Sequence, residues 1–366
     1  MKRWLLLLLS ACTQAAAPSS PAHPAASAAS SAAPAPPPSA PVPAPLTLEE
    51  LTPTNELPDE IDDVVEGRAP SAEHPEGTLV MASRAQLFEW DVHQQRVVRA
   101  ANAGTNELRI TRHNQTYYIL TKKSNSLQIH VLDQEWNPLH TLELDARTMV
   151  DDGQENPEFV RNSDERAPLE KLELAVNDER INVAGKPDNA SLGPSLLVAL
   201  FNHSGERLAV RRFWGAERTL PPRTIGVMGK YAVVLAHQFE GSRAGSDKAR
   251  GPRGPLGLYT FDDSESLKWT ELLHDLRTGV GTLSVVGERA IVVADGKCTL
   301  FDDATHARRP CAARSPSWVL TPQGALLAPP ASSKGLRCAS TWVSDHAYLA
   351  CVPDVRPTTL RVFRPQ

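Results

Sequence analysis

The chain has 366 residues, among them 31 prolines, and a formal net charge of −5 at pH 7. This charge gives no reason to expect a nucleic acid partner, and the length suits either two average domains or one repeat domain of about 250–300 residues. The charge is uneven, since residues 49–76 hold ten acidic side chains and one basic side chain, which leaves residues 77–366 almost neutral.

The N-terminus has the features of an export signal. Lys2 and Arg3 precede a short apolar run, and Leu9-Ser10-Ala11-Cys12 follows it. These four residues resemble the bacterial lipobox, whose cysteine is acylated and becomes the first residue of the mature protein. The resemblance implies a signal peptide at 1–11, a membrane anchor on Cys12 and, because Thr13 follows instead of aspartate, the outer membrane. The periplasmic face of that membrane is the expected location, and the outer surface is the alternative. The alternative is an ordinary secretory signal with a chance cysteine.

Two linker segments are predicted between this anchor and the folded part. Residues 12–48 are rich in Pro, Ala and Ser and lack the large apolar side chains of a core, so they favour an extended spacer. Residues 49–76 are expected to continue it as an acidic linker. Their carboxylates at Asp59, Glu60 and Asp62 do not follow the EF-hand spacing, which disfavours a calcium site.

From residue 77 onward the sequence has the period of short strands. The residues that close the third strand of each unit recur about every 40 positions, with insertions: Asp91, Asp133, Asn202, Asp262 and Asp302. Four-stranded antiparallel units of this length are typical of β-propeller blades. We therefore predict an all-β fold, a propeller of six four-stranded blades over residues 77–366. A count of seven blades is the alternative, because the strand pattern of residues 317–352 is ambiguous. The alternative fold is a two-sheet sandwich.

Two expectations concern the ends of this propeller. The first unit, with strands at 79–83, 86–92 and 95–101, lacks an inner strand. The C-terminal segment, whose last repeat is Leu360-Arg361-Val362-Phe363, is expected to complete it and so close the ring.

Two units carry the clearest repeat pattern. Asp295-Gly296 is a hairpin signal between a β-branched run and Leu300-Phe301-Asp302, and residues 258–262 end in Phe-Asp in the same way. This pattern resembles the quinoprotein-like propeller repeat, without its Thr-Gly turn. The resemblance supports the fold and implies no activity.

Four cysteines besides Cys12 form two pairs with the same spacing. A hairpin centred on residues 304–305 places Cys298 opposite Cys311, and one centred on 344–345 places Cys338 opposite Cys351. Opposite residues of antiparallel strands lie within disulfide range, so both pairs are predicted to be disulfides. A zinc site is disfavoured because neither pair has CxxC spacing.

The functional face is predicted from propeller topology. Loops from second to third strands and between blades share one face, and the insertions 146–170, 186–194 and 240–256 belong to these loops. The second strands end at the same face, where the candidate binding residues are Ser83, Lys122, Lys186, His237 and Asp295. Satisfied strand ends and tolerated surface insertions are the plain alternatives.

The preferred function is an envelope lipoprotein whose propeller is a non-catalytic platform for a protein partner, similar at the level of anchor and fold to propeller lipoproteins of the outer-membrane barrel-assembly machinery. No catalytic residue, metal or cofactor is assigned, since the sequence has no G-x-S-x-G, H-E-x-x-H or P-loop motif. The rival is a small-ligand binder or metal-dependent enzyme at the channel mouth.

Overall fold

The computed structural model describes much of the chain beyond residue 47: residues 48–51, 61–83, 86–103, 108–123, 126–145, 169–187, 195–214, 225–237, 256–263, 267–272, 281–294, 297–302, 307–311, 319–320, 326–327, 336–343, 346–353 and 360–365. The regular structure of these residues is entirely β-strand. Within these ranges no helix has the length and apolarity to cross a membrane.

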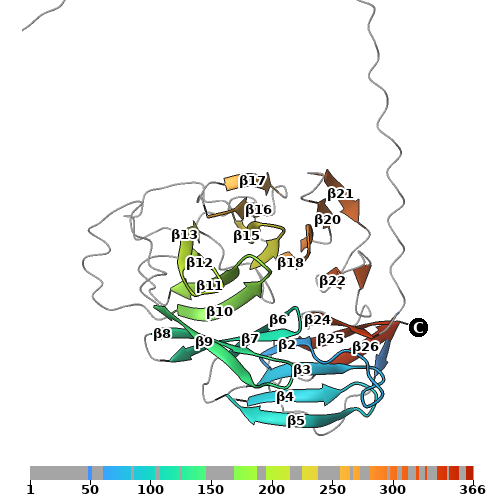
Figure 1. Ribbon diagram of the computed structural model, residues 1–366. Coiled ribbons are helices and arrows are strands. Elements are labelled where there is room, and N and C mark those ends of the chain that lie inside the picture. Colours follow the sequence, from blue (N-terminus) through green and yellow to red (C-terminus); the bar gives the residue numbers. More distant parts are fainter. Residues whose placement is uncertain are drawn as a thin grey trace, which may run out of the picture. The chain divides into compact units, whose positions relative to one another are not determined.

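Most of the strands form six antiparallel four-stranded sheets, here called blades 1 to 6 from the position of the inner strand in the chain (Figure 1). Blade 1 contains β2 (Asp63–Glu66), β3 (Thr78–Ser83), β4 (Gln86–Asp91) and β5 (Arg96–Asn102). Blade 2 contains β6 (Leu108–His113), β7 (Thr116–Lys123), β8 (Ser126–Leu132) and β9 (Pro138–Asp145). Blade 3 contains β10 (Leu169–Val176), β11 (Ile181–Pro187), β12 (Ser195–Phe201) and β13 (Arg207–Trp214).

The second half of the chain repeats this plan. Blade 4 contains β14 (Ile225–Met228), β15 (Tyr231–His237), β16 (Leu256–Phe261) and β17 (Leu267–Leu272). Blade 5 contains β18 (Gly281–Val286), β19 (Arg289–Ala294), β20 (Lys297–Asp302) and β21 (Ala307–Cys311). Blade 6 contains β24 (Leu336–Val343), β25 (His346–Pro353), β26 (Arg361–Pro365) and, at its outer edge, β1 (Leu48–Leu51).

The inner strands pack against one another in chain order from β2 to β18, and β24 packs against β2 to close a ring. A short two-stranded sheet, β22 (Val319–Leu320) with β23 (Leu326–Leu327), lies between blades 5 and 6 and contacts both β18 and β24. The predicted all-β propeller with six four-stranded blades is therefore confirmed. The ambiguous stretch 317–352 holds this small sheet and the first strands of blade 6.

The hairpin signals in the sequence correspond to real hairpins. Ala294 pairs with Lys297, so β19 and β20 are joined by the predicted two-residue Asp295-Gly296 connection. Ile291, Val292 and Val293 are buried because each faces one of the two neighbouring layers of the propeller. The five residues predicted to close the third strands also stand at the ends of β4, β8, β12, β16 and β20 or directly after them.

The ring closes differently from the expectation. Blade 1 has its own inner strand, β2, and the N-terminal strand β1 pairs with β26 to complete blade 6. The completing strand thus comes from the opposite end of the chain: an N-terminal strand completes the last blade, whereas a C-terminal strand was expected to complete the first. Leu48 packs with Leu349 and Phe363 of blade 6, while Leu51 belongs to a cluster that reaches Trp90 of blade 1.

Segment 49–76, predicted as an acidic linker, contains most of β1, all of β2 and an ordered loop. The many carboxylates made this segment resemble a solvated linker, although it contains two short strands with buried apolar residues. Val64 and Val65 of β2 are examples. Asp63 shows why acidic residues occur here, since its Oδ2 accepts a hydrogen bond from the backbone nitrogen of Ile110 in blade 2. The folded domain therefore begins earlier than residue 77.

Similar bonds join the inner strands around the ring. Arg109 of blade 2 donates to the carbonyl of Leu172 at 2.6 Å, and Glu173 of blade 3 accepts from the nitrogen of Ile225 at 3.1 Å. Ser284 of blade 5 accepts from the nitrogen of Leu320 in the two-stranded sheet. Together with the Asp63 bond, these contacts link blades 1 to 4 in succession and blade 5 to the two-stranded sheet, which favours a rigid ring.

One predicted disulfide is present. Cys298 and Cys311 are directly opposite in β20 and β21 and form a disulfide with a Cα–Cα distance of 5.0 Å. The register also places Cys338 opposite Cys351, as the hairpin centred on 344–345 requires, and Cys351 is disulfide-bonded.

Replacing both Cys298 and Cys311 with alanine is expected to lower the free energy of unfolding by about 3 kcal/mol, the chain-entropy value for a loop this short. Urea denaturation of the oxidised protein and the double variant measures the difference. A loss below about 1 kcal/mol would show that the disulfide does not constrain the unfolded chain.

Candidate functional site

Four of the five predicted face residues stand where propeller topology requires. Ser83 ends β3, Lys122 and Lys186 lie in the last residues of β7 and β11, and His237 ends β15. They occupy blades 1 to 4 at the ends of second strands, so they share one face of the ring. Asp295 lies outside the described residues. Ser83 is buried and Lys122 is half-buried, and both already have interactions within the chain.

The three predicted insertions leave strand ends at this same face. Residues 146–168 connect β9 to β10, 188–194 connect β11 to β12, and 238–255 connect β15 to β16. All three lie outside the described residues. Within the described ranges, no group of three or more His, Cys, Asp or Glu side chains could hold a metal ion.

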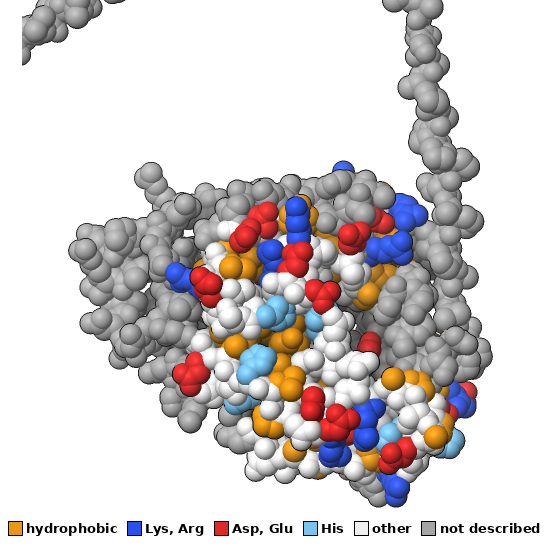
Figure 2. Space-filling view, in the orientation of Figure 1, with side chains coloured by type: hydrophobic (Ala, Val, Ile, Leu, Met, Phe, Trp, Pro, Cys, Tyr) orange, Lys and Arg blue, Asp and Glu red, His pale blue; other side chains and the backbone are white. Residues whose placement is uncertain are grey.

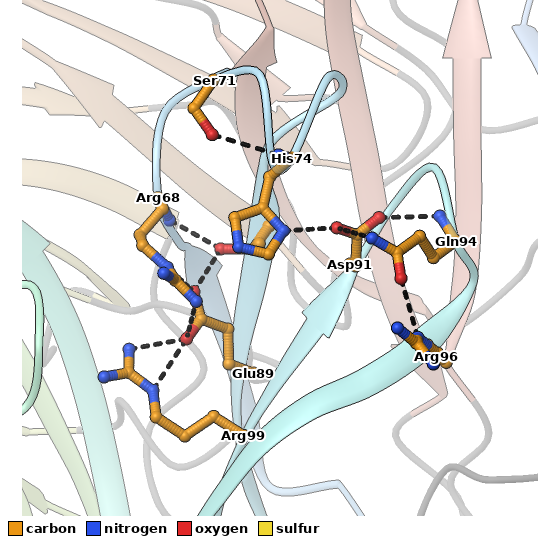
Figure 3. A network of polar contacts seen from close by, with 9 residues as sticks. Arg68, Ser71, His74, Glu89, Asp91, Gln94, Arg96 and Arg99 are labelled. Carbon is orange, nitrogen blue, oxygen red and sulfur yellow. Dashed lines mark hydrogen bonds and ion pairs between the residues drawn. The ribbon is translucent and has the colours of Figure 1, made fainter.

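A network of polar contacts lies toward the other end of blade 1, where β3 begins, around the carboxylate of Glu89 (Figure 3). Arg68 donates to both carboxylate oxygens, at 2.7 Å and 3.1 Å. Arg99 donates from Nε at 2.9 Å and contacts the same carboxylate from Nη2 at 2.6 Å. Thr78 adds a 2.7 Å bond from its hydroxyl. Glu89 is fully buried, so its charge is compensated by two arginines and a hydroxyl.

The electrostatics of this site follow from its burial. Burial alone raises the pKa of Glu89, but the hydrogen bonds from Arg68 and Thr78 and the charge of Arg99 outweigh it, so the pKa is lowered. Burial also raises the pKa of nearby Tyr117 to about 12, which keeps its hydroxyl protonated.

Blade 2 covers this site from the side. The Arg99 guanidinium lies 3.9 Å from the ring centroid of Trp136 and donates to the carbonyl of Gln134. Because Arg99 comes from β5 and Trp136 from the turn before β9, the contact joins the outer parts of blades 1 and 2. The Glu89 site therefore holds two neighbouring blades together.

A second buried pair sits beside it. His74 Nδ1 donates to Asp91 Oδ2 at 2.5 Å, and both side chains are buried (Figure 3). The other oxygen of Asp91 accepts from the backbone nitrogen of Gln94, and the His74 backbone nitrogen donates to Ser71. This pair ties the loop between β2 and β3 to the end of β4. WD-type repeats carry a Gly-His dipeptide upstream of a Trp-Asp dipeptide; in this chain Glu73 precedes His74, so only the histidine and Trp90-Asp91 agree with that pattern.

Gly67 is required where this loop begins. A Cβ at Gly67 would lie 2.2 Å from Thr78 Oγ1 and 2.6 Å from the Thr78 carbonyl oxygen. We expect Gly67→Ala to destabilise the fold by about 1–3 kcal/mol, because Thr78 must move away from Glu89. Gly287→Ala is the control: its Cβ meets nothing within 4 Å, and only the positive φ of 58° opposes it, at about 1 kcal/mol. Thermal unfolding of both variants tests whether Gly67→Ala lowers the midpoint more than Gly287→Ala does. Equal midpoints would contradict the expected clash at Gly67.

The turns between first and second strands form a chain of contacts across blades. His113 contacts Asp178 at 2.8 Å, Asn177 donates to the carbonyl of Gly229, and the Gly229 nitrogen donates to the carbonyl of Gly287. His203 adds a bond to the carbonyl of Asn177. Figure 2 shows histidine side chains gathered near the middle of the described surface, with acidic and basic side chains around them. The contacts between these turns link blades 2, 3, 4 and 5 in succession and so stabilise the ring.

Neither the Glu89 site nor the His74–Asp91 pair is predicted from the sequence. Glu89 stands in QLFEWD between two apolar residues, and only its burial shows that it is structural. The available signal was the Trp-Asp dipeptide with an upstream histidine.

No family model and no curated protein matches the chain. Solved structures with a similar arrangement include KlHsv2 with loop 6CD replaced by a Gly-Ser linker, with 10% identity and a TM-score of 0.44 over 84% of this chain and 98% of that one. Hsv2 from Kluyvelomyces marxianus has 11% identity and a TM-score of 0.42 over 81% and 93%. TolB from Acinetobacter baumannii has 10% identity and a TM-score of 0.37 over 83% and 63%. At these values the likenesses carry no functional argument, and the propeller assignment rests on the strand pairing of the chain itself.

Proposed function

We propose that this chain is a cell-envelope lipoprotein, anchored through Cys12 to the periplasmic face of the outer membrane, whose propeller is a non-catalytic platform for a protein partner. The observation that carries the proposal is the exit of connections 146–168, 188–194 and 238–255 from strand ends at one face. Long loops on a rigid scaffold are where proteins usually build binding surfaces. The blade-to-blade bonds favour such a scaffold.

The charges of these connections suggest a partner with both signs of charge. Residues 146–168 contain more acidic than basic side chains, whereas 238–255 contain more basic than acidic ones. Two oppositely charged loops from different blades orient a partner better than one, because a rotated complex would bring like charges together.

In vivo cross-linking of a tagged full-length chain, followed by mass spectrometry, tests the platform. The test variant replaces residues 146–168 with a Gly-Ser linker that preserves the ends of β9 and β10. The matched control replaces 188–194 in the same way. A partner that is lost only in the first variant supports the proposal and locates the binding face. Equal capture by both variants, or stoichiometric metal or a small molecule in the purified protein instead of a partner, contradicts it.

Anchoring is tested separately. Cys12→Ser is expected to move the protein from the membrane fraction to the soluble envelope fraction, because two or three acyl chains, each methylene adding about 0.8 kcal/mol, would be lost. Fractionation and acyl labelling measure this. Membrane association that persists in the Ser variant would contradict the anchor while leaving the platform to be judged by cross-linking.

A further inference from the structure

β1 is recognised by the edge of β26 through four consecutive positions. Leu48 and Leu51 are buried, in clusters formed mainly by blades 6 and 1, and the two glutamates between them face arginines. Glu50 accepts from Arg361 Nε at 2.7 Å and Nη2 at 2.6 Å, and Glu49 accepts from Arg364 at 3.3 Å. The edge therefore selects a strand of the pattern Leu-Glu-Glu-Leu, which occurs once in the chain.

The backbone of β1 is nevertheless held from one side alone. The strand has four residues and pairs with one neighbour. Its ion pairs are partly exposed, with Glu49 at 50% and Arg364 at 40%, so releasing them exposes little that water does not already reach. Residues 52–60 join β1 to blade 1, while every β1 backbone pair is made with the C-terminal strand.

We propose that the edge of β26 is a strand-acceptor site that also takes β1 from a second copy of this chain, giving a strand-exchanged dimer. Exchange of an identical element keeps each of its contacts, so it is a low-cost route to dimers. The second copy is the occupant because the two leucines and two glutamates of β1 already match this edge. A connection as long as 52–60 spans at most about 30 Å, so the two copies must meet near their sixth blades.

Engineered disulfides test this, because Glu49 and Arg364 are directly opposite in the register. Two full-length proteins, each with Cys12→Ser, carry Glu49→Cys in one copy and Arg364→Cys in the other. They are mixed, incubated and oxidised. A covalent dimer of unlike copies requires β1 of the first to lie on β26 of the second. As a collision control, Arg364→Cys is replaced by Arg96→Cys on the exposed edge strand β5.

The proposal predicts roughly tenfold more covalent dimer with Arg364→Cys than with Arg96→Cys, because exchange holds the cysteines at a high effective concentration. Adding Arg361→Glu to the acceptor copy should reduce the yield, and Glu50→Arg in the donor copy should restore it. A single chain carrying both Glu49→Cys and Arg364→Cys confirms that the geometry permits the bond. If that chain closes its disulfide while the mixture gives no more dimer than the control, the proposal is wrong.

Discussion

Glu89→Ala is expected to lower the free energy of unfolding by about 3 kcal/mol or more. Removing one partner of a buried ion pair typically costs about 3–5 kcal/mol, because the remaining charge loses its compensation. Here two guanidinium groups, Arg68 and Arg99, would face each other without the carboxylate. Their exposed fractions of 29% and 25% allow some rehydration, which favours the lower end of this range.

Chemical denaturation measures this loss, with Glu66→Ala as the control. Glu66 pairs with Arg112 at 3.6 Å and is partly exposed, so its loss should cost about 0–1 kcal/mol. Equal losses in the two variants would show that the Glu89 site does not stabilise the junction of blades 1 and 2.

The same site predicts a pH dependence. The pKa of Glu89 is lowered in the folded state, so its contribution to stability is fully present above the unfolded value near 4.5 and is lost as pH falls through the folded value. The stability difference between wild type and Glu89→Ala should therefore shrink below about pH 4.5. Denaturation series at pH 7 and in acid test it, and a difference that grows in acid would contradict it.

Replacing Leu48 and Leu51 together with alanine is expected to cost about 4 kcal/mol. Truncating a buried leucine costs about 2–5 kcal/mol, and a short edge strand lies at the lower end of that range. The two side chains belong to different clusters, so their effects should be roughly additive.

The matched control changes the two exposed residues of the same strand. Glu49→Ala with Glu50→Ala removes the two partly exposed ion pairs, each worth about 0–1 kcal/mol. Thermal and urea unfolding of both double variants rank the effects. A larger loss for the glutamate pair would mean that charge, and not apolar burial, holds β1 in blade 6.

The sequence allowed the blade architecture to be predicted because most blades carry local signals. The Asp295-Gly296 signal specifies the register of β19 with β20. The 13-residue separation of Cys298 and Cys311 specifies the register of β20 with β21. The closing strand could not be found in this way, because β1 pairs with β26 across almost the whole chain and its four residues, LEEL, lack strand periodicity. Strand β2 was missed because carboxylates surround its two buried valines.

For the predicted binding face, the sequence indicated where its residues stand but not whether they bind a ligand or partner. Ser83, Lys122, Lys186 and His237 stand at strand ends that topology places on one face, but loop conformation decides whether such residues bind anything. The Glu89 and His74 sites depend on burial and on contacts between loop and strand, which no local pattern reveals apart from Trp90-Asp91.

Hydrogen exchange of the full-length protein, measured by mass spectrometry, tests most directly whether the N-terminal segment is part of the propeller. Peptides covering β1 and β2 are expected to exchange slowly, and Leu48→Ala with Leu51→Ala is expected to accelerate exchange in both β1 and β26. Exchange of residues 48–51 and 61–66 at the rate of an unfolded chain, with β26 unaffected by the double variant, would contradict this expectation.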